Sequence, residues 1–145
     1  MEIYTIGFTK KSAEEFFGLL KGASIRRLID VRLNNVSQLA AFTKRDDLRF
    51  FLRELCNADY RHEPRLAPTD DILKAYQRKE IDWVEYARAF CALLEERSVE
   101  TLVDRVMLVV PTVLLCSEPT AAKCHRRLVA DYLAAAWGDT TVVHL

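Results

Sequence analysis

The feature that most constrains the fold is the alternation of short apolar runs with longer segments of helical periodicity. Strands become near-continuous apolar runs when helices cover both faces of a parallel sheet. The sequence therefore predicts a three-layer α/β/α domain with a largely parallel sheet of about four or five strands. We expect strands at residues 3–6, 26–31, 113–116 and 140–145, with a short extended piece at 60–62.

Capping residues mark where several helices begin. Ser12, followed by Glu15 three residues later, forms a capping-box pattern. Thr69 and Asp82 precede two further segments of helical periodicity. Ser98 fits either the cap of another helix or the continuation of the helix that starts after Asp82.

The last helix carries a dense group of reactive side chains. Pro119 suits its first turn, and Gly138 is the usual kind of residue at a helix end. We therefore expect a helix from Pro119 to Trp137. Adjacent residues on a helix point about 100° apart, so Cys124 and His125 are not expected to face one point.

Length and charge exclude several classes of protein. The 145 residues suit a single domain, 1–145. The 21 Lys and Arg residues balance 21 Asp and Glu residues, so bulk attraction to nucleic acid is not supported. An apolar stretch of 11 residues, VMLVVPTVLLC, falls short of the roughly 18 that a membrane span needs. With no export signal and no CxxC pair, we expect a cytoplasmic protein with free cysteines.

Polar and reactive side chains follow the predicted strands at the point where each strand ends. In open parallel sheets, ligands bind beyond the carboxyl ends of the strands. We therefore predict a crevice at this edge of the sheet. The residues that the sequence places there are Gly7, Asp30, Arg32, His62, Cys116, Glu118, Lys123, Cys124, His125 and Arg126.

Chemistry suggests a role for each of these residues. Arg32 and Arg126 would bind an anionic group, because a guanidinium matches carboxylate or phosphate. Glu118 would be a general acid or base, and Cys116 or His125 a nucleophile or second acid–base group. The remaining expected substrate-binding residues are Asp30, His62 and Gly7.

Structural alternatives exist for three of these positions. Asp30 and Arg32 would point to the same side of a strand and could form a structural ion pair. Glu118 would be favoured near a helix N-terminus by the macrodipole alone. Cys116 closes an apolar strand, where a buried thiol is usually inert.

A metal site receives less support from the sequence. Cys116, Cys124, His125 and His62 are suitable zinc ligands, but the spacing of the two cysteines is not standard and adjacent ligands on a helix are awkward. The single turn at Gly7 is not a dinucleotide fingerprint. The sequence thus predicts no metal and identifies no cofactor.

Other cysteines and the tryptophans have simpler explanations. Cys56 and Cys91 fall on expected core faces of helices. Trp83 and Trp137 are expected in the core or at an interface rather than as stacking platforms for bases.

Five blocks of the sequence resemble the domain-of-unknown-function 488 family. They are IYTIGFTKKSAEEFFGLL, LIDVRLNNVS, YRHEP, LLCSEPTAAKCHRRLVADYL and the closing VVHL. The resemblance covers most of the chain and implies an α/β domain, with DVR, Cys-x-Glu and Cys-His-Arg as motif residues. Phe8 stands where members commonly carry histidine. In the segment after His62-Glu63-Pro64, members of the family often carry paired glycines. This chain has Arg65, Leu66 and Ala67 instead.

These observations favour an enzyme that acts on a small anionic or nucleotide-like substrate in the crevice. A nucleic acid would have to be recognised by that pocket and not by bulk charge. Phe8, and the absence of a recognisable dyad or triad, favour instead a non-catalytic ligand-binding or regulatory module. A thiol redox or metal-binding protein built on Cys116 and Cys124 is a third alternative.

Overall fold

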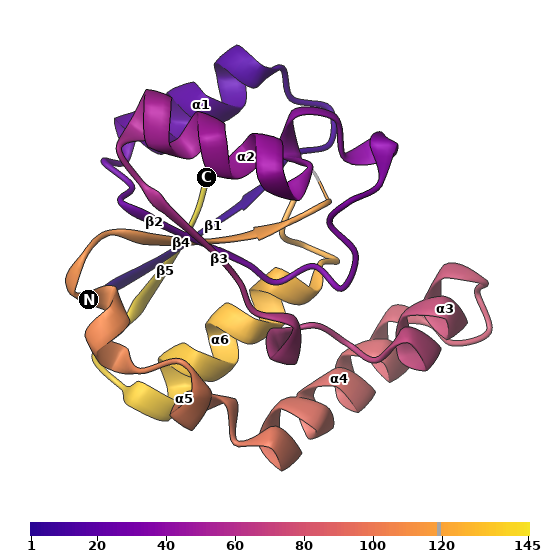
Figure 1. Ribbon diagram of the computed structural model, residues 1–145. Helices are drawn as coiled ribbons and strands as arrows, with labels where there is room; N and C mark the ends of the chain where they lie inside the picture. The colour runs from indigo at the N-terminus through magenta and orange to yellow at the C-terminus, as the bar shows by residue number, and fades with distance from the viewer. Residues whose placement is uncertain (119) are drawn as a thin grey trace.

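Five parallel strands form the sheet, in the order β3-β2-β4-β1-β5 (Figure 1). The structure is a computed structural model that describes residues 1–118 and 120–145. Every strand pair in it is parallel, which confirms the predicted fold class. The strands are β1 Glu2–Gly7, β2 Arg27–Asp30, β3 Asp59–His62, β4 Thr112–Cys116 and β5 Thr141–His144.

Helices cover both faces of the sheet, giving three layers. Helices α1 (Ala13–Gly22) and α2 (Arg45–Phe51) lie on one face. On the other face lie α4 (Trp83–Arg97), α5 (Val99–Leu102) and α6 (His125–Trp137). Helix α3 (Asp70–Gln77) packs against α4 and projects beyond the sheet.

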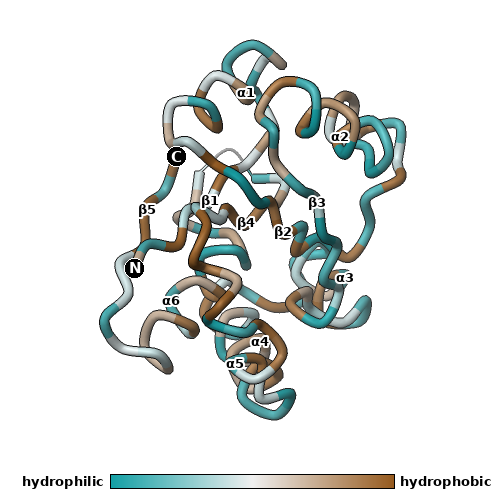
Figure 2. The backbone as a smooth tube through the Cα atoms, turned by 60° about the vertical axis from the view of Figure 1, so that its left-hand side comes forward, coloured by the Kyte–Doolittle hydropathy of each residue, from teal (hydrophilic) through white to brown (hydrophobic). Residues whose placement is uncertain are grey.

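Each face of the sheet has its own hydrophobic core. Phe16 and Leu20 of α1 and Leu48 of α2 fill one cluster, whereas Phe90 of α4 and Val129 of α6 belong to the other. Figure 2 shows hydrophobic residues concentrated along the central strands. No helix within the described residues is both long enough and apolar enough to span a membrane.

The three predicted caps are confirmed. The Ser12 hydroxyl accepts a hydrogen bond from the Glu15 amide, and Thr69 and Asp82 cap α3 and α4 in the same way. The Ser98 side chain makes no capping hydrogen bond, but its amide donates to the Glu95 carbonyl at the end of α4, and its backbone is left-handed with φ 50°. It separates α4 from the short α5 and stands at the N-cap position of α5, as the first expectation has it, although without the side-chain hydrogen bond of a capping serine.

The last helix starts later than expected. It begins at His125 and not near Pro119, which lies outside the described residues. Cys124 precedes the helix in an extended conformation, with φ −137° and ψ 140°. The helix ends at Trp137 before Gly138, which has φ 63°, as predicted.

The connections between strands create a crevice at the carboxyl end of β4. This strand lies between β2 and β1, and its five residues are all buried. The chain leaves β1 and β2 towards α1 and α2 on one face, but leaves β4 towards α6 on the other. Ligands bind in open sheets where neighbouring connections diverge in this way. Cys116 is the last residue of β4.

Candidate functional site

Asp30 and Arg32 form a buried ion pair beyond the end of β2. Arg32 Nε and NH2 each donate to one Asp30 carboxylate oxygen at 2.8 Å, and the two residues are 3% and 0% exposed. Arg32 also donates to the hydroxyl and carbonyl oxygens of Thr43, and Tyr60 donates to Asp30. Most of the guanidinium is thus used to tie the loop at 33–43 to the sheet, as the structural alternative predicts.

Arg126 is fully buried and has a different environment. Its Nε donates to Thr5 Oγ1 at 3.3 Å and its NH1 to the Glu118 carbonyl oxygen at 2.7 Å. Among the described residues, no carboxylate lies within ion-pair distance of this guanidinium. Because Arg126 is in the first turn of α6, its charge also opposes the helix macrodipole. A buried charge is costly unless an opposite charge compensates it.

Gly7 makes room for this arrangement. It ends β1 beside Cys116 in the register of β4. A Cβ atom at Gly7 would overlap the Glu118 carbonyl oxygen and lie 2.9 Å from Arg126 NH1. The absence of a side chain at Gly7 therefore lets the loop after β4 approach β1 and present its carbonyl to Arg126.

Two cysteine sulfur atoms and a histidine ring nitrogen lie close together at the end of β4. The donor atoms of Cys116, Cys124 and His125 lie within 4.8 Å of one another, and all three residues are buried. Cys116 Sγ is 3.4 Å from His125 Nδ1 and 3.6 Å from Nε2. His125 Nε2 lies 2.7 Å from the Val31 carbonyl oxygen. That oxygen can only accept, so Nε2 carries the proton and Nδ1 keeps its lone pair.

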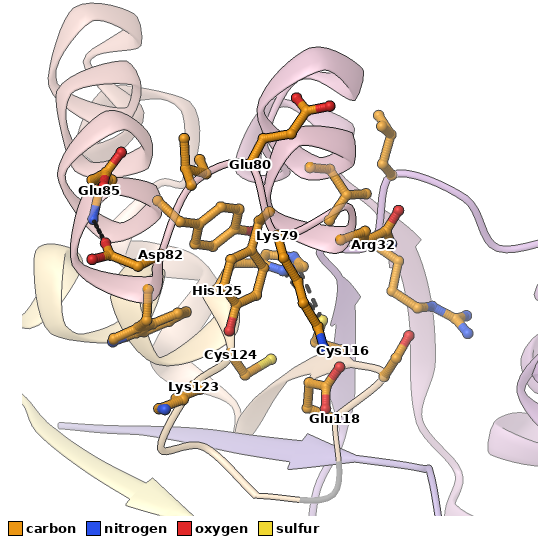
Figure 3. A pocket seen from close by; sticks show the side chains of 18 of the residues that line it. Arg32, Lys79, Glu80, Asp82, Glu85, Cys116, Glu118, Lys123, Cys124 and His125 are labelled. Atoms are coloured by element: carbon orange, nitrogen blue, oxygen red, sulfur yellow. Dashed lines mark hydrogen bonds between the residues drawn. The ribbon is translucent and has the colours of Figure 1, made fainter.

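Cys124 and His125 converge on Cys116, contrary to the expectation that they point apart. The expectation assumed that both residues are helical. Because Cys124 precedes α6 in an extended conformation, the 100° rotation between helical neighbours does not apply to it. Figure 3 shows the two side chains on the same side of the cavity, next to Cys116.

Protonation at this centre is uneven. Burial raises the pKa of the Cys116 thiol, but a hydrogen bond from Cys124, the Ser117 amide and the charge of Arg126 outweigh burial, and the net pKa is lowered. The hydrogen bond to Cys116 and burial raise the pKa of Cys124. Burial lowers the pKa of His125, which favours the neutral imidazole. Negative charge is therefore most favourable on Cys116.

His62 and Glu118 lie at the margins of this centre. His62 Nε2 is 2.7 Å from the Arg32 carbonyl oxygen, so His62 supports the loop after β2 and does not join the cluster of donors. The Glu118 side chain is exposed, although its carbonyl binds Arg126. In Figure 3, Glu118 and Lys123 lie near Cys116 and Cys124 at the edge of the cavity.

A cavity of about 890 Å³ opens beside Cys116. One wall comes from β4, the following loop and the start of α6, and the other from α3 and α4 (Figure 3). Sequence reasoning missed the second wall, because no local pattern indicates that α3 and α4 face the strand ends. The residues missed include Tyr76, Lys79, Glu80, Trp83 and Tyr86.

The donor set at Cys116, Cys124 and His125 also suits a thiophilic metal. Two thiolates and an imidazole are ligands that Zn²⁺ accepts, and three protein ligands leave a fourth position for substrate or water. The Val31 carbonyl would fix the ring of His125, because a metal-binding histidine commonly donates its other ring N–H to a carbonyl or carboxylate. The three residues therefore fit such an ion chemically.

Comparison with known proteins identifies the family of the chain. A family model described as "Domain of unknown function DUF488" matches residues 12–133. The chain belongs to this family, which confirms the resemblance found in its sequence motifs. No curated protein and no solved structure matches the chain.

The first prediction concerns the packing at Gly7. Gly7→Ala should lower the free energy of unfolding by about 2–3 kcal/mol, because the new methyl group overlaps the Glu118 carbonyl. Gly18→Ala is the matched control, since it lies within α1 with nothing near its Cβ position and should stabilise by roughly 0.5–1 kcal/mol. Urea unfolding measures both. Equal stability of the two variants would contradict this account of Gly7.

The second prediction separates buried from exposed ion pairs. Asp30→Asn leaves the Arg32 guanidinium buried without its counter-charge and should cost about 3–5 kcal/mol. Asp46→Asn removes the exposed pair with Arg45 and should leave the midpoint of unfolding nearly unchanged, because solvent screens an exposed pair. Chemical unfolding of the two variants provides the comparison, and a small effect at Asp30 would show that the pair is dispensable.

Proposed function

We propose that this member of the family is an enzyme that transfers a group from a small anionic substrate by way of the Cys116 thiolate. One observation carries the proposal: Arg126 is a fully buried cation with no carboxylate within ion-pair distance among the described residues. Its charge calls for an anion at the end of β4. Two anions can compensate this charge: the thiolate of Cys116 and the anionic group of a bound substrate.

The surroundings of Cys116 support a nucleophilic role. The thiol closes the central strand, borders the cavity and has a lowered pKa. The Cys124 thiol remains protonated and donates to it. His125 Nδ1, at 3.4 Å, is free to accept the Cys116 proton because Nε2 is bonded to the Val31 carbonyl. A thiol beside a base that a third group holds in place is the usual arrangement of an activated cysteine.

The proposed step is a displacement at the substrate's electrophilic atom. The thiol proton passes to His125 Nδ1, and a bond forms between Cys116 sulfur and the electrophilic atom. The bond to the leaving group breaks, and the leaving group takes that electron pair and the proton from His125. Water then gives a proton to His125 and bonds to the group on sulfur. The bond to sulfur breaks, and the proton on His125 returns to Cys116, which regenerates the thiol. Arg126 and the N-terminus of α6 stabilise the negative charge of the substrate.

The third prediction tests both the thiolate and the anion site. Iodoacetate and iodoacetamide differ mainly in charge, and both alkylate thiolates. Cys116 should react at a lower pH than a free thiol, and relative to glutathione it should prefer iodoacetate. Arg126→Gln should reduce that preference about ten-fold, equivalent to about 1.4 kcal/mol. Peptide mass mapping identifies the alkylated cysteine.

Two controls keep this experiment decisive. Arg126→Lys retains the charge and should retain most of the preference for iodoacetate. In the unmodified protein, inorganic phosphate should slow iodoacetate more than iodoacetamide, a result that does not depend on whether an Arg126 variant folds. Equal rates for the two reagents, after normalisation to glutathione, would rule out an anion site at Cys116.

A thiophilic metal centre is the second candidate function, favoured by the convergence of Cys116, Cys124 and His125. The fourth prediction distinguishes it. If the centre binds metal, native mass spectrometry after incubation with Zn²⁺ and removal of excess metal should show one ion per chain. Cys124→Ala should abolish this ion and Cys91→Ala should not, since Cys91 is outside the cluster. An intact mass equal to that of the metal-free polypeptide would exclude the metal centre, and the thiolate mechanism would then be the remaining candidate.

The cysteines also bear on location. All four are free thiols in the structure, and a mechanism that depends on a reduced Cys116 suits a reducing compartment. We therefore propose a cytoplasmic location.

A further inference from the structure

Three aromatic rings form the wall of the cavity contributed by α3 and α4. Tyr76 and Tyr86 are stacked, with ring centroids 4.6 Å apart and an interplanar angle of 29°. Trp83 lies 5.5 Å from Tyr86 and 5.9 Å from Tyr76. Tyr86 is 2% exposed, whereas Tyr76 and Trp83 are half-buried and line the cavity. Aromatic surface is therefore left for a ligand at Tyr76 and Trp83, and Trp83 is not a simple core residue.

Helix α3 reinforces this conclusion. It is amphipathic, but none of its residues is fully buried. Leu73 and Tyr76, two of its apolar residues, line the cavity and remain half-buried. The chain thus leaves an apolar and aromatic surface facing the cavity of about 890 Å³, a size within the usual range of small-ligand sites.

The two walls of the cavity differ in charge. The wall from α3 and α4 carries Glu80, Asp82 and Glu85, with Lys79 as its cation (Figure 3). The opposite wall has Lys123 and Glu118 at its edge (Figure 3). Arg126 does not line the cavity, but it is buried close enough to Cys116 for its charge to lower the pKa of that thiol. The cavity is therefore rich in hydrogen-bond acceptors at its aromatic end. At its reactive end Lys123 and Glu118 offset each other, which leaves the buried charge of Arg126 uncompensated near Cys116.

We infer that the substrate carries a flat nitrogen heterocycle with N–H donors, joined to an anionic group. The ring would stack on Tyr76 and Trp83, where nearby carboxylates accept its N–H groups. The anionic group would lie towards Arg126 and Cys116. This inference rests on the proposed function, because it assigns the anionic end to the same centre. A nucleoside monophosphate has the required chemistry, and adenosine monophosphate is a suitable probe.

Trp83 provides the reporter for a binding experiment. The chain has two tryptophans, so Trp137→Phe leaves Trp83 as the single tryptophan, which can be excited at a wavelength that tyrosine does not absorb. The titration is done with Cys116→Ser as well, which removes the nucleophile but preserves the cavity. We expect adenosine monophosphate to quench Trp83 fluorescence saturably, and ribose 5-phosphate to bind at least ten-fold more weakly.

Matched variants locate the subsite. Tyr76→Ala should weaken binding of adenosine monophosphate at least ten-fold, and Tyr76→Phe should restore it because the ring remains. Tyr132→Ala is the control: Tyr132 is a half-buried tyrosine on α6 that bonds Glu100 and is not among the residues lining the cavity. If Tyr76→Ala fails to fold, Tyr76→Leu keeps apolar volume without the aromatic face and should show the same loss.

The outcomes separate this inference from the proposed function. Equal affinity of Tyr76→Leu or Tyr76→Ala and the unmodified protein, or equal affinity for ribose 5-phosphate and adenosine monophosphate, would overturn the aromatic subsite. The alkylation experiment uses no ring-bearing ligand. Loss of the iodoacetate preference with ring-dependent binding retained would therefore remove the thiolate mechanism and leave the subsite.

Discussion

The burial of Arg126 is the interaction on which the arrangement of the site depends. Its guanidinium lies below the end of β1, bound to Thr5 and to the carbonyl of Glu118. That position requires a glycine at Gly7, because any side chain would occupy the path of the loop. It also requires the loop after β4 to fold back before α6 begins.

The same cation organises the chemistry of the central strand. Burial raises the pKa of the Cys116 thiol, but hydrogen bonds from Cys124 and the Ser117 amide lower it, and the charge of Arg126 lowers it further. Arg32, the arginine of the DVR motif, has a different role. The Asp30 carboxylate neutralises its charge, and the hydroxyl and carbonyl oxygens of Thr43 accept its other hydrogen bonds. One arginine therefore stabilises the loops, and the other leaves positive charge at the reactive centre. The two look equivalent in sequence and differ through their neighbours.

Local patterns predict the fold well where the governing interactions are local. The helix starts at Ser12, Thr69 and Asp82 follow from side chains that bond amides three residues later. The start of α6 could not be predicted in this way. Its position follows from contacts between the loop after β4, Gly7 and Arg126, which are distant in sequence. The error of about one and a half turns changed the predicted chemistry, because it placed Cys124 inside a helix.

The sequence by itself determined the three-layer fold, the edge of the sheet that holds the reactive residues, and the family to which the chain belongs. Apolar periodicity and motif residues carry that information, since both are properties of short segments. The tertiary structure decided which side chains meet: Cys124 and His125 at Cys116, and Asp30 at Arg32. It also decided that α3 and α4 supply the aromatic wall. Convergence of this kind depends on long-range packing and loop conformation, which no local pattern records.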